Sequence, residues 1–345
     1  MADYRSTGKE LRKSPKGMIA GLIALTLLGI SGYGVYRTAM GMRALDALPV
    51  PGSDTEISVP EISEIGTEPE NKIIYSYETT DASEIKNGRL ILVNRDYATD
   101  DIKDGLVTMF EKKTDSYGLK DTSLKLLEEP LTAFNAMAEA FHTDNNGAKL
   151  LVTGAYRTKE DQRKIYSSSL SSKTADGKVT AAMAGFSDYE TGCSVSLTVM
   201  KDGQYLDLGG DDCENERRWF SAKAAEYGFI LRYPEDKTEI TGFPYESGHF
   251  RYVGAVHALY MQGAGLCLEE YLTKLRDYTY DGTRLTAPDA KGMACEVFFV
   301  PVQPDAASVE VPVPADGVYQ RSGNNVDGFI VTAETGEPYE TSSAE

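Results

Sequence analysis

Residues 187–196 read SDYETGCSVS and continue directly into LTV at 197–199. From Cys193 onward, apolar side chains alternate with serine or threonine. Because successive side chains of a β-strand point to opposite faces of its sheet, this alternation predicts a half-buried strand. Ser194 and Ser196 lie on one face of that strand, and its inward-facing residues are Cys193, Val195, Leu197 and Val199.

Two further segments of mixed polar and glycine residues lie on either side of this strand in the sequence. GAYRTKEDQ at 154–162 follows a short apolar strand at 149–153 and leads into a predicted helix over 159–169, with the threonine before it as candidate N-cap. YESGHFRYVG at 245–254 leads into a predicted helix over 253–262, which the next glycine would end. Each segment therefore lies where one element passes into the next.

The rest of the chain mixes helices and strands without a regular alternation of the two. Helical spacing of apolar residues marks 131–142, and an amphipathic helix is predicted over 214–227, closed by Gly228. Strand-like apolar runs occupy 89–97, 295–300, 309–313 and 329–332. This order is typical of an α+β fold.

In this order and spacing, the three segments resemble the motifs of the VanY-type D-alanyl-D-alanine carboxypeptidases. Those motifs resemble S-G-Y-R-S with a nearby glutamine, then S-x-H-x-x-G-x-A-x-D, then E-P-W-H-x-R-Y-V-G. The likeness runs from about Arg89 to Leu275. The resemblance implies a VanY or hedgehog-type metallopeptidase fold, with a central antiparallel sheet flanked by helices and, here, a C-terminal β extension.

The resemblance also implies a zinc site, and this chain departs from it at decisive positions. In the family, the histidine and aspartate of the second motif and the histidine of the third bind one zinc. Tyr189 stands where the family has the first histidine, and Ser196 stands where it has the aspartate. Only His249, the ligand of the third motif, remains. A catalytic zinc needs three protein ligands and one open position, so the expected set is incomplete.

No other residue replaces the lost ligands by spacing. The remaining histidines, His142 and His257, lie in predicted helices outside the motifs, and strand alternation points Cys193 away from Ser196. Tyr189 could bind metal only as a phenolate, which needs a much lowered pKa. We therefore expect no cofactor, although the family uses zinc.

Other motif positions keep the family's residue. Glu246 matches the general base of the third motif and is expected to remain as its remnant, although Ser247 and Gly248 replace proline and tryptophan. By resemblance, the substrate contacts are Arg157, Gln162 and Ser187.

Each substrate-contact position also has a structural alternative. A guanidinium pairs well with the carboxylate end of a peptide, but Arg157 could instead form a surface salt bridge to Glu160 or Asp161. Gln162 and Ser187 could cap or hydrogen-bond the backbone.

An uncharged segment near the N-terminus predicts a membrane anchor. Residues 18–36, MIAGLIALTLLGISGYGVY, are long enough to span a bilayer core of about 30 Å. A cleaved signal peptide or a buried helix are the alternatives. Basic residues are more frequent before the segment than after it, which places the N-terminus in the cytoplasm and the rest outside the cell.

The expected organisation follows from these observations. It comprises a cytoplasmic tail, a transmembrane helix, an acidic proline-containing extracellular stalk, a carboxypeptidase-like domain, a β-rich C-terminal extension and a flexible tail, at 1–17, 18–36, 37–71, 72–280, 281–335 and 336–345.

The net charge argues against one class of partner, and the cysteine count leaves open whether the thiols are free or form disulfides. The net charge of -18 argues against nucleic acid as a partner. An even count of cysteines outside the cell fits two disulfides, but buried free thiols fit as well. The cysteines are Cys193, Cys213, Cys267 and Cys295.

The function expected from these features is a membrane-anchored, extracellular carboxypeptidase-like protein of cell-wall peptidoglycan metabolism. With an incomplete ligand set, it would act as a pseudoenzyme that binds a peptidoglycan stem peptide or a surface protein. The alternatives are an active zinc D-Ala-D-Ala carboxypeptidase with a rearranged metal site and a purely structural surface domain.

Overall fold

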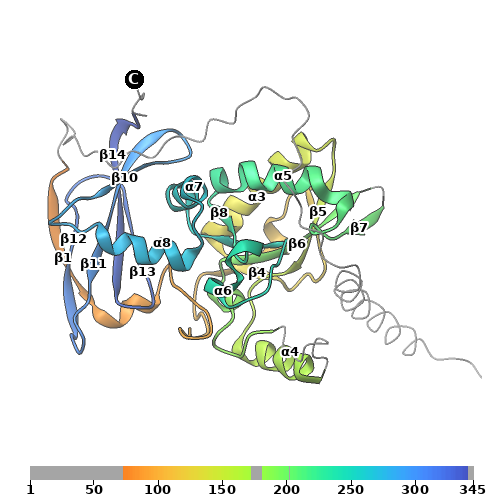
Figure 1. The fold of residues 1–345 in the computed structure, drawn as a ribbon, viewed down its shortest axis with the longest axis horizontal. Helices are drawn as coiled ribbons and strands as arrows, with labels where there is room; N and C mark the ends of the chain where they lie inside the picture. The colour runs from red at the N-terminus through yellow and green to blue at the C-terminus, as the bar shows by residue number, and fades with distance from the viewer. Residues whose placement is uncertain (1–72, 172–180, 202, 341–345) are drawn as a thin grey trace, which may run out of the picture. The chain divides into compact units, whose positions relative to one another are not determined.

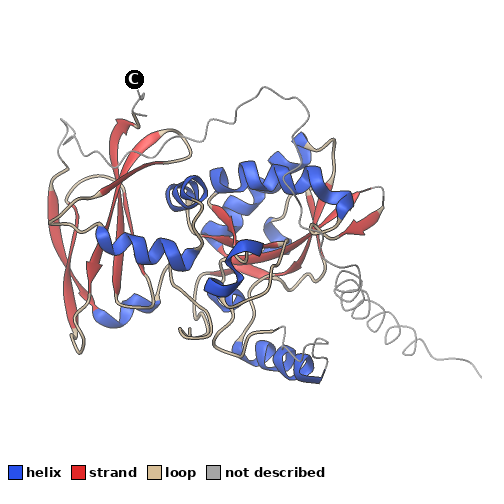
Figure 2. Cartoon of the chain, viewed as in Figure 1, coloured by secondary structure: helices blue, strands red, loops and turns tan. Residues whose placement is uncertain are grey.

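The structure, a computed structural model, describes residues 73–171, 181–201 and 203–340 (Figures 1 and 2). The predicted membrane segment and stalk lie outside the described residues. Among the described residues, no helix combines the length and the apolar character needed to cross a membrane.

A six-stranded sheet carries the three motif segments. Its strands run in the order β3-β5-β6-β9-β8, with β7 added beside β6. The pair β3 and β5 is parallel and the other pairs are antiparallel, so the predicted central antiparallel sheet is confirmed with one parallel edge. The strands are β3 Tyr117–Leu119, β5 Lys149–Gly154, β6 Ser194–Lys201, β7 Gln204–Leu206, β8 Phe229–Leu231 and β9 His249–Tyr252.

Two helices, α3 Glu128–Asp144 and α5 Glu214–Lys223, cover one face of this sheet (Figure 1). Phe134 of α3 and Phe220 of α5 pack with Val195 of β6 and Phe250 of β9 in one hydrophobic core. The alternation read from the sequence holds, because all the predicted inward residues of β6 are at most 3% exposed. The opposite face of β6, with Ser194 and Ser196, is thereby left for the site.

The helices of the described chain are mostly short. The α-helices are α2 Met109–Lys112, α3 Glu128–Asp144, α4 Lys159–Ser171, α5 Glu214–Lys223, α6 Thr238–Thr241, α7 Ala255–Ala264 and α8 Leu268–Lys274. The 3-10 helices, written η, are η1 Ala82–Lys86, η2 Asp188–Thr191, η3 Asp211–Cys213, η4 Ala224–Tyr227, η5 Glu235–Lys237 and η6 Leu275–Asp277.

The last strands form a second group, which we call the C-terminal β module. A four-stranded sheet has the order β10-β11-β14-β13, and β12 pairs with β1, the first described strand. Phe298, Val311 and Phe329 make its core. The strands are β1 Tyr75–Asp81, β10 Leu285–Pro288, β11 Met293–Pro301, β12 Ser308–Pro314, β13 Tyr319–Gly323 and β14 Gly328–Pro338; a separate pair joins β2 Leu106–Thr108 and β4 Lys125–Leu127.

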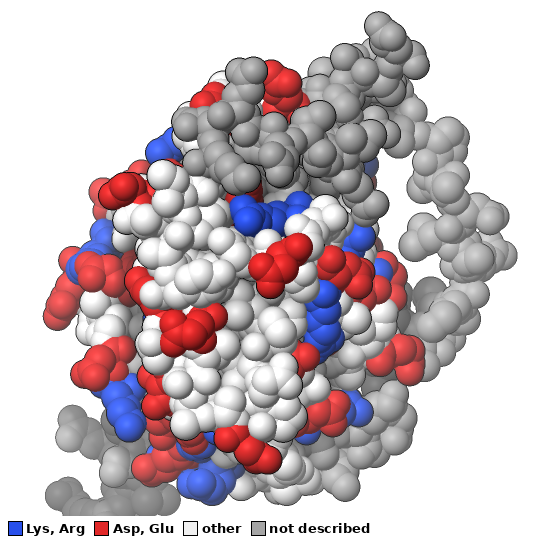
Figure 3. Space-filling model, turned by 90° about the vertical axis from the view of Figure 1, so that its left-hand side faces the viewer, with Lys and Arg blue, Asp and Glu red and all other residues white. Residues whose placement is uncertain are grey.

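Charges on the face shown in Figure 3 are dispersed. Acidic and basic side chains lie around a central area of uncharged residues. The sequence-wide excess of acidic over basic residues is therefore not gathered into one patch on this face.

Several predicted elements differ from the structure. The predicted strand over 89–97 is an irregular segment, buried at 90–94, because its backbone groups bond to the side chains of Ser322, Asn325 and Arg251 rather than pairing with a neighbouring strand. The helix predicted over 253–262 is α7, two residues later, and ends at Gly265, whose φ of +64° is left-handed. The helix predicted over 214–227 divides into α5 and η4.

The structure also shows the state of the cysteines and the extent of the last strand. All four cysteines are buried free thiols, so the two-disulfide alternative is not realised. Strand β14 continues to Pro338, beyond the point at which a loose tail is predicted to begin.

Candidate functional site

The positions at which the family binds zinc come together on the face of the sheet opposite α3 and α5. Strands β6 and β9 pair so that Ser196 lies opposite His249. The short helix η2 precedes β6 and places Tyr189 beside both, with its hydroxyl hydrogen-bonded to Ser196 and its ring centroid 4.5 Å from that of His249. The alignment of motifs made from the sequence is therefore geometrically consistent.

Arg157 reaches this cluster from the loop after β5. Its guanidinium carbon lies 3.7 Å from the ring centroid of Tyr189, a close cation–π contact, and Nη1 donates to Oε1 of Gln162 at 3.3 Å. Arg157 has no carboxylate partner among the described residues. Of the two candidates, Glu160 pairs with Lys164, and Asp161 accepts from Thr158 and Lys164. The half-buried cation is thus held in place but not neutralised by an ion pair.

Gln162 and Ser187 are occupied by hydrogen bonds within the chain. Gln162 is 1% exposed, and its amide nitrogen donates to the carbonyl of Ala182 at 2.7 Å. Ser187 caps η2 in a reciprocal capping box with Glu190. Both residues support the walls of the site around Arg157 and Tyr189.

A buried carboxylate beneath the site was missed in the sequence. Asp188 is 1% exposed; its Oδ1 accepts from Arg251 at 2.5 Å and from Arg232 at 3.3 Å. Arg232 also makes a bidentate contact with Glu269 at 3.0 and 2.7 Å. Burial raises the pKa of Asp188, but Arg251, His249 and Arg232 outweigh it and hold that pKa well below its usual range. No periodic signal in the sequence marks it, because Asp188 precedes the alternation that begins at Cys193.

His249 uses both ring nitrogens. Nδ1 lies 2.8 Å from Oε2 of Glu246, and Nε2 lies 3.3 Å from Oδ2 of Asp188. Burial lowers the pKa of His249, but hydrogen bonds to Asp188 and Glu246 raise it more, so the net shift is upward. The two carboxylates thus favour the protonated ring, whereas metal binding needs a free nitrogen lone pair.

The other two positions also fit zinc poorly. Burial and the nearby Glu246 raise the pKa of Tyr189 to about 12, so the phenol stays protonated at neutral pH. Ser196 offers a neutral hydroxyl already bonded to that phenol. Among the described residues, no group of three or more His, Cys, Asp or Glu side chains is placed to hold a metal ion. The residues present therefore do not form the donor set that zinc prefers.

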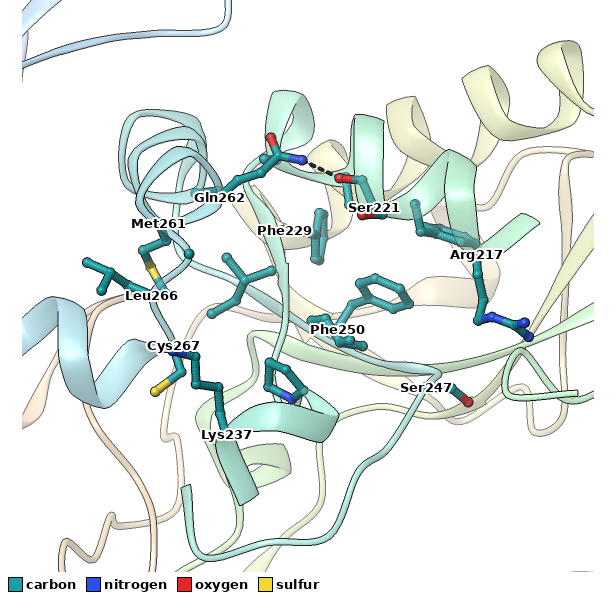
Figure 4. A pocket seen from close by; sticks show the side chains of 18 of the residues that line it. Arg217, Ser221, Phe229, Lys237, Ser247, Phe250, Met261, Gln262, Leu266 and Cys267 are labelled. Carbon is teal, nitrogen blue, oxygen red and sulfur yellow. Dashed lines mark hydrogen bonds between the residues drawn. The ribbon is translucent and has the colours of Figure 1, made fainter. Parts of the chain in front are cut away.

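A cavity of about 420 Å³ lies beside β8 and β9, at one edge of the sheet (Figure 4). Phe229 of β8, Phe250 of β9 and Met261 of α7 line it, together with Ser247 from the third motif. Side chains alternate along β9, so Phe250 points away from the face that carries His249. This cavity is separate from the cluster around Tyr189.

Comparison with known proteins identifies relatives of this arrangement. Residues 123–255 match the model of the family described as VanY: D-alanyl-D-alanine carboxypeptidase. A D-alanyl-D-alanine carboxypeptidase of Enterococcus faecium is 30% identical over 273 residues, which cover 77% of this chain and 81% of that protein.

The solved structures that resemble this chain include proteins of the same kind. The vancomycin resistance D,D-dipeptidase VanXYg, in complex with a D-Ala-D-Ala phosphinate analog, is 29% identical with a TM-score of 0.63, over 76% of this chain and 99% of that chain. A mutant D,D-pentapeptidase VanY from a VanB-type resistance cassette, in complex with Zn(II), is 28% identical with a TM-score of 0.43, over 53% and 98%.

These relatives correct one expectation. The expectation that this chain has no cofactor is contradicted, because a relative of the same family was solved with Zn(II). The donor set found around Tyr189 differs from the one that the family resemblance implies.

Proposed function

Because this chain belongs to the VanY family of D-alanyl-D-alanine carboxypeptidases, we propose that it binds peptidoglycan stem peptides by their terminal carboxylate without cleaving them. Its place in the family makes it a D-Ala-D-Ala carboxypeptidase-like protein of the cell wall. The observation that carries the proposal is Arg157, a half-buried guanidinium without a carboxylate partner among the described residues.

The surroundings of Arg157 suit a carboxylate ligand. The ring of Tyr189 supports one face of the guanidinium, and Gln162 holds Nη1, so the planar group is oriented before a ligand arrives. A guanidinium fixed in this way presents its remaining N–H groups as a fork that matches the two oxygens of a carboxylate. Pre-orientation reduces the entropy lost on binding.

The groups that would cleave a peptide are engaged with each other. A general base must reach a water that is activated for attack. Glu246 is 35% exposed at its side chain, but its Oε2 lies 2.8 Å from the ring of His249. Tyr189 and Ser196, at positions where the family has zinc ligands, are hydrogen-bonded to each other through their hydroxyls. This arrangement supports binding rather than hydrolysis.

The test is titration calorimetry of the chain without residues 1–36, which we call the ectodomain, with a pentapeptide ending in D-Ala-D-Ala, and with the same peptide as its carboxamide. We expect binding of the free acid only. Arg157→Gln should weaken binding by about tenfold or more, since a hydrogen bond to a charged group contributes about 1.5–3 kcal/mol. Arg163→Gln is the matched control, because Arg163 is an exposed arginine on α4. Equal binding of acid and amide would refute the proposal.

Release of D-alanine decides between binding and catalysis. The partly exposed Glu246 beside His249 is the observation that favours an active peptidase with a rearranged metal site. If the ectodomain releases D-alanine with added zinc, and Glu246→Gln abolishes that release, the chain is an enzyme. If neither binding nor release occurs, the purely structural role remains, with Tyr189 closing the site.

The location of this domain rests on the sequence alone. We also propose that residues 18–36 anchor the chain in the cell membrane with the carboxypeptidase-like domain outside. The full chain should then stay with membranes after alkaline carbonate extraction, whereas a chain lacking 18–36 should not. A membrane fraction free of the full chain would contradict this.

A further inference from the structure

The irregular segment 85–101, which we call the strap, runs between the C-terminal β module and the candidate site. Its apolar residues are buried: Leu90 is 1% exposed, Leu92 is 5% and Val93 is 0%. It has no strand or α-helix of its own after η1. A local turn at Asn94–Tyr97 supplies some of its backbone hydrogen bonds, and other parts of the molecule supply the rest described below.

One end of the strap is hydrogen-bonded to the last residues of β13 and to the turn that follows. Every residue from Ser322 to Asn325 takes part: the Ser322 hydroxyl accepts from Leu90 N, Gly323 N donates to the Asn87 carbonyl, the Asn324 carbonyl accepts from Leu92 N, and Asn325 N donates to the Ile85 carbonyl. The approach is close, because a Cβ added at Gly323 would lie 2.1 Å from the Ile85 carbonyl oxygen.

Asn325 makes the central contact of this turn. Its side-chain amide nitrogen donates to the carbonyls of Leu92 at 2.8 Å and of Ala98 at 2.9 Å. These carbonyls lie on either side of a bend in the strap, so one side chain holds the bend closed. Asn325 has a φ of +59°, a left-handed conformation that asparagine and glycine tolerate.

The strap in turn holds the two arginines that pair with Asp188. Nη2 of Arg251 donates to the carbonyls of Arg89 and Ile91 at 2.9 and 3.1 Å. The Asn94 amide donates to Glu269, the carboxylate that binds Arg232, at 3.3 Å. The charged cluster beneath His249 thus depends on the course of the strap.

The far end of the strap reaches the loop that presents Arg157. Thr99 N donates to the Gly185 carbonyl at 2.7 Å, two residues before Ser187. Asp101 accepts from the backbone N–H of Lys159, the first residue of α4, at 2.7 Å, and Asp100 pairs with the Lys159 ammonium at 2.7 Å. The first motif, at Lys159, and the residues just before the second motif, at Gly185, are therefore both hydrogen-bonded to the strap.

We propose that Asn325 is a positioning residue for the carboxylate site, acting through the strap on Arg157 and on the Asp188 cluster. The C-terminal β module then sets the geometry of the site rather than forming an independent extension. This inference rests on the proposed binding function. The side-chain amide of Asn325 donates to the carbonyls of Leu92 and Ala98, so its effect on the site is transmitted through them.

The test compares the ectodomain with Asn325→Gly, which keeps the left-handed backbone and removes both amide donors. Binding of the D-Ala-D-Ala pentapeptide should weaken about tenfold, because the buried Leu92 carbonyl and the part-buried Ala98 carbonyl lose the donor that holds the bend. Hydrogen exchange at the backbone amides of Thr99 and Lys159 should become faster. Thr99 N–H donates from the far end of the strap to Gly185, and Lys159 N–H donates to Asp101 at that same end.

Two controls separate positioning from a general loss of stability. Asn146→Gly changes an exposed asparagine with a φ of +53° that lies outside the strap contacts. Arg321→Gln removes the ion pair between Arg321 of β13 and Glu78 of β1 within the module but leaves Asn325 unchanged. Both should bind peptide as the wild type does.

The outcomes are distinguishable. Unchanged peptide binding by Asn325→Gly, or an equal loss with Arg321→Gln, overturns the positioning role. If the wild type binds no peptide, the proposed function fails, and exchange at Thr99 and Lys159 still decides whether Asn325 controls the strap. Unchanged exchange at both amides overturns the inference in that case.

Discussion

At the scale of single residues, Tyr189 changes the chemistry of the site. A histidine at this position would offer a ring nitrogen to a metal, whereas Tyr189 offers an aromatic face to Arg157 and a hydroxyl to Ser196. Its pKa of about 12 keeps the hydroxyl protonated. Residue 189 therefore packs against the Arg157 guanidinium instead of serving as a metal ligand.

Gly248 is the residue of the third motif at which a substitution should cost most. A Cβ at this position would lie 2.4 Å from the backbone carbonyl oxygen of Leu197, which cannot move without distorting β6. We expect Gly248→Ala to lower the free energy of unfolding by about 2–4 kcal/mol, measured by urea denaturation.

The matched control is Gly118→Ala in β3. A Cβ there would meet only a side-chain methyl group of Leu151, at 3.4 Å. Its cost should stay below about 1 kcal/mol. Equal stabilities of the two variants would show that the loop before His249 adapts to a side chain.

At the scale of elements, α7 is joined to both α8 and β14 through His257. Its Nδ1 lies 2.7 Å from the Tyr271 hydroxyl and its Nε2 lies 3.0 Å from the Thr332 hydroxyl. The histidine is 2% exposed, and burial, with a smaller effect of Arg89, lowers its pKa to about 3. A neutral imidazole therefore bridges three elements.

This bridge predicts a loss of stability in mild acid. In the unfolded chain a histidine takes up a proton below about pH 6.5, whereas His257 in the folded state stays neutral to about pH 3. Its contribution is fully present above pH 6.5 and is lost as the pH falls, by about 1.4 kcal/mol per unit. Between pH 7.5 and pH 5, the wild type should lose about 2 kcal/mol more than His257→Gln.

Urea denaturation at the two pH values measures this difference. His142→Gln is the control, because His142 is a half-buried histidine of α3 that bonds only to the Ala148 carbonyl. If His257→Gln loses as much stability in acid as the wild type, His257 does not carry the effect.

At the scale of the whole molecule, the carboxypeptidase-like domain and the C-terminal β module share a hydrophobic core. Leu90 of the strap and Val253 before α7 pack in one cluster with Leu285, Val297 and Ile330 of the module. The first described strand, β1, pairs with β12. The boundary at residue 280, drawn from the sequence, therefore crosses a continuous core.

A chain ending at residue 280 should fail to fold cooperatively. It would lose the burial of Leu285, Val297 and Ile330, each worth about 1.5–3 kcal/mol, from a total stability of about 5–15 kcal/mol. Thermal unfolding followed by circular dichroism checks this against a chain ending at residue 340. A cooperative transition within a few degrees of the longer chain would contradict a shared core.

The sequence by itself determined the family, the fold class and the alternation of β6. Each of these depends on local order: a strand has a period of two, and the three motifs keep their spacing. It also located the positions that differ from the family, Tyr189 and Ser196, which the structure then places together.

Only the tertiary structure decided the roles of the strap and of Asp188. A buried apolar run such as residues 90–93 has the same local pattern in a strand and in an irregular segment, and the partners that distinguish them lie more than 200 residues away, at Ser322 and Asn325. Asp188 likewise takes its charge partners from β9 and from the residue after β8. Long-range contacts of this kind leave no periodic trace in the sequence, because periodicity records which face an element buries and not what it is buried against.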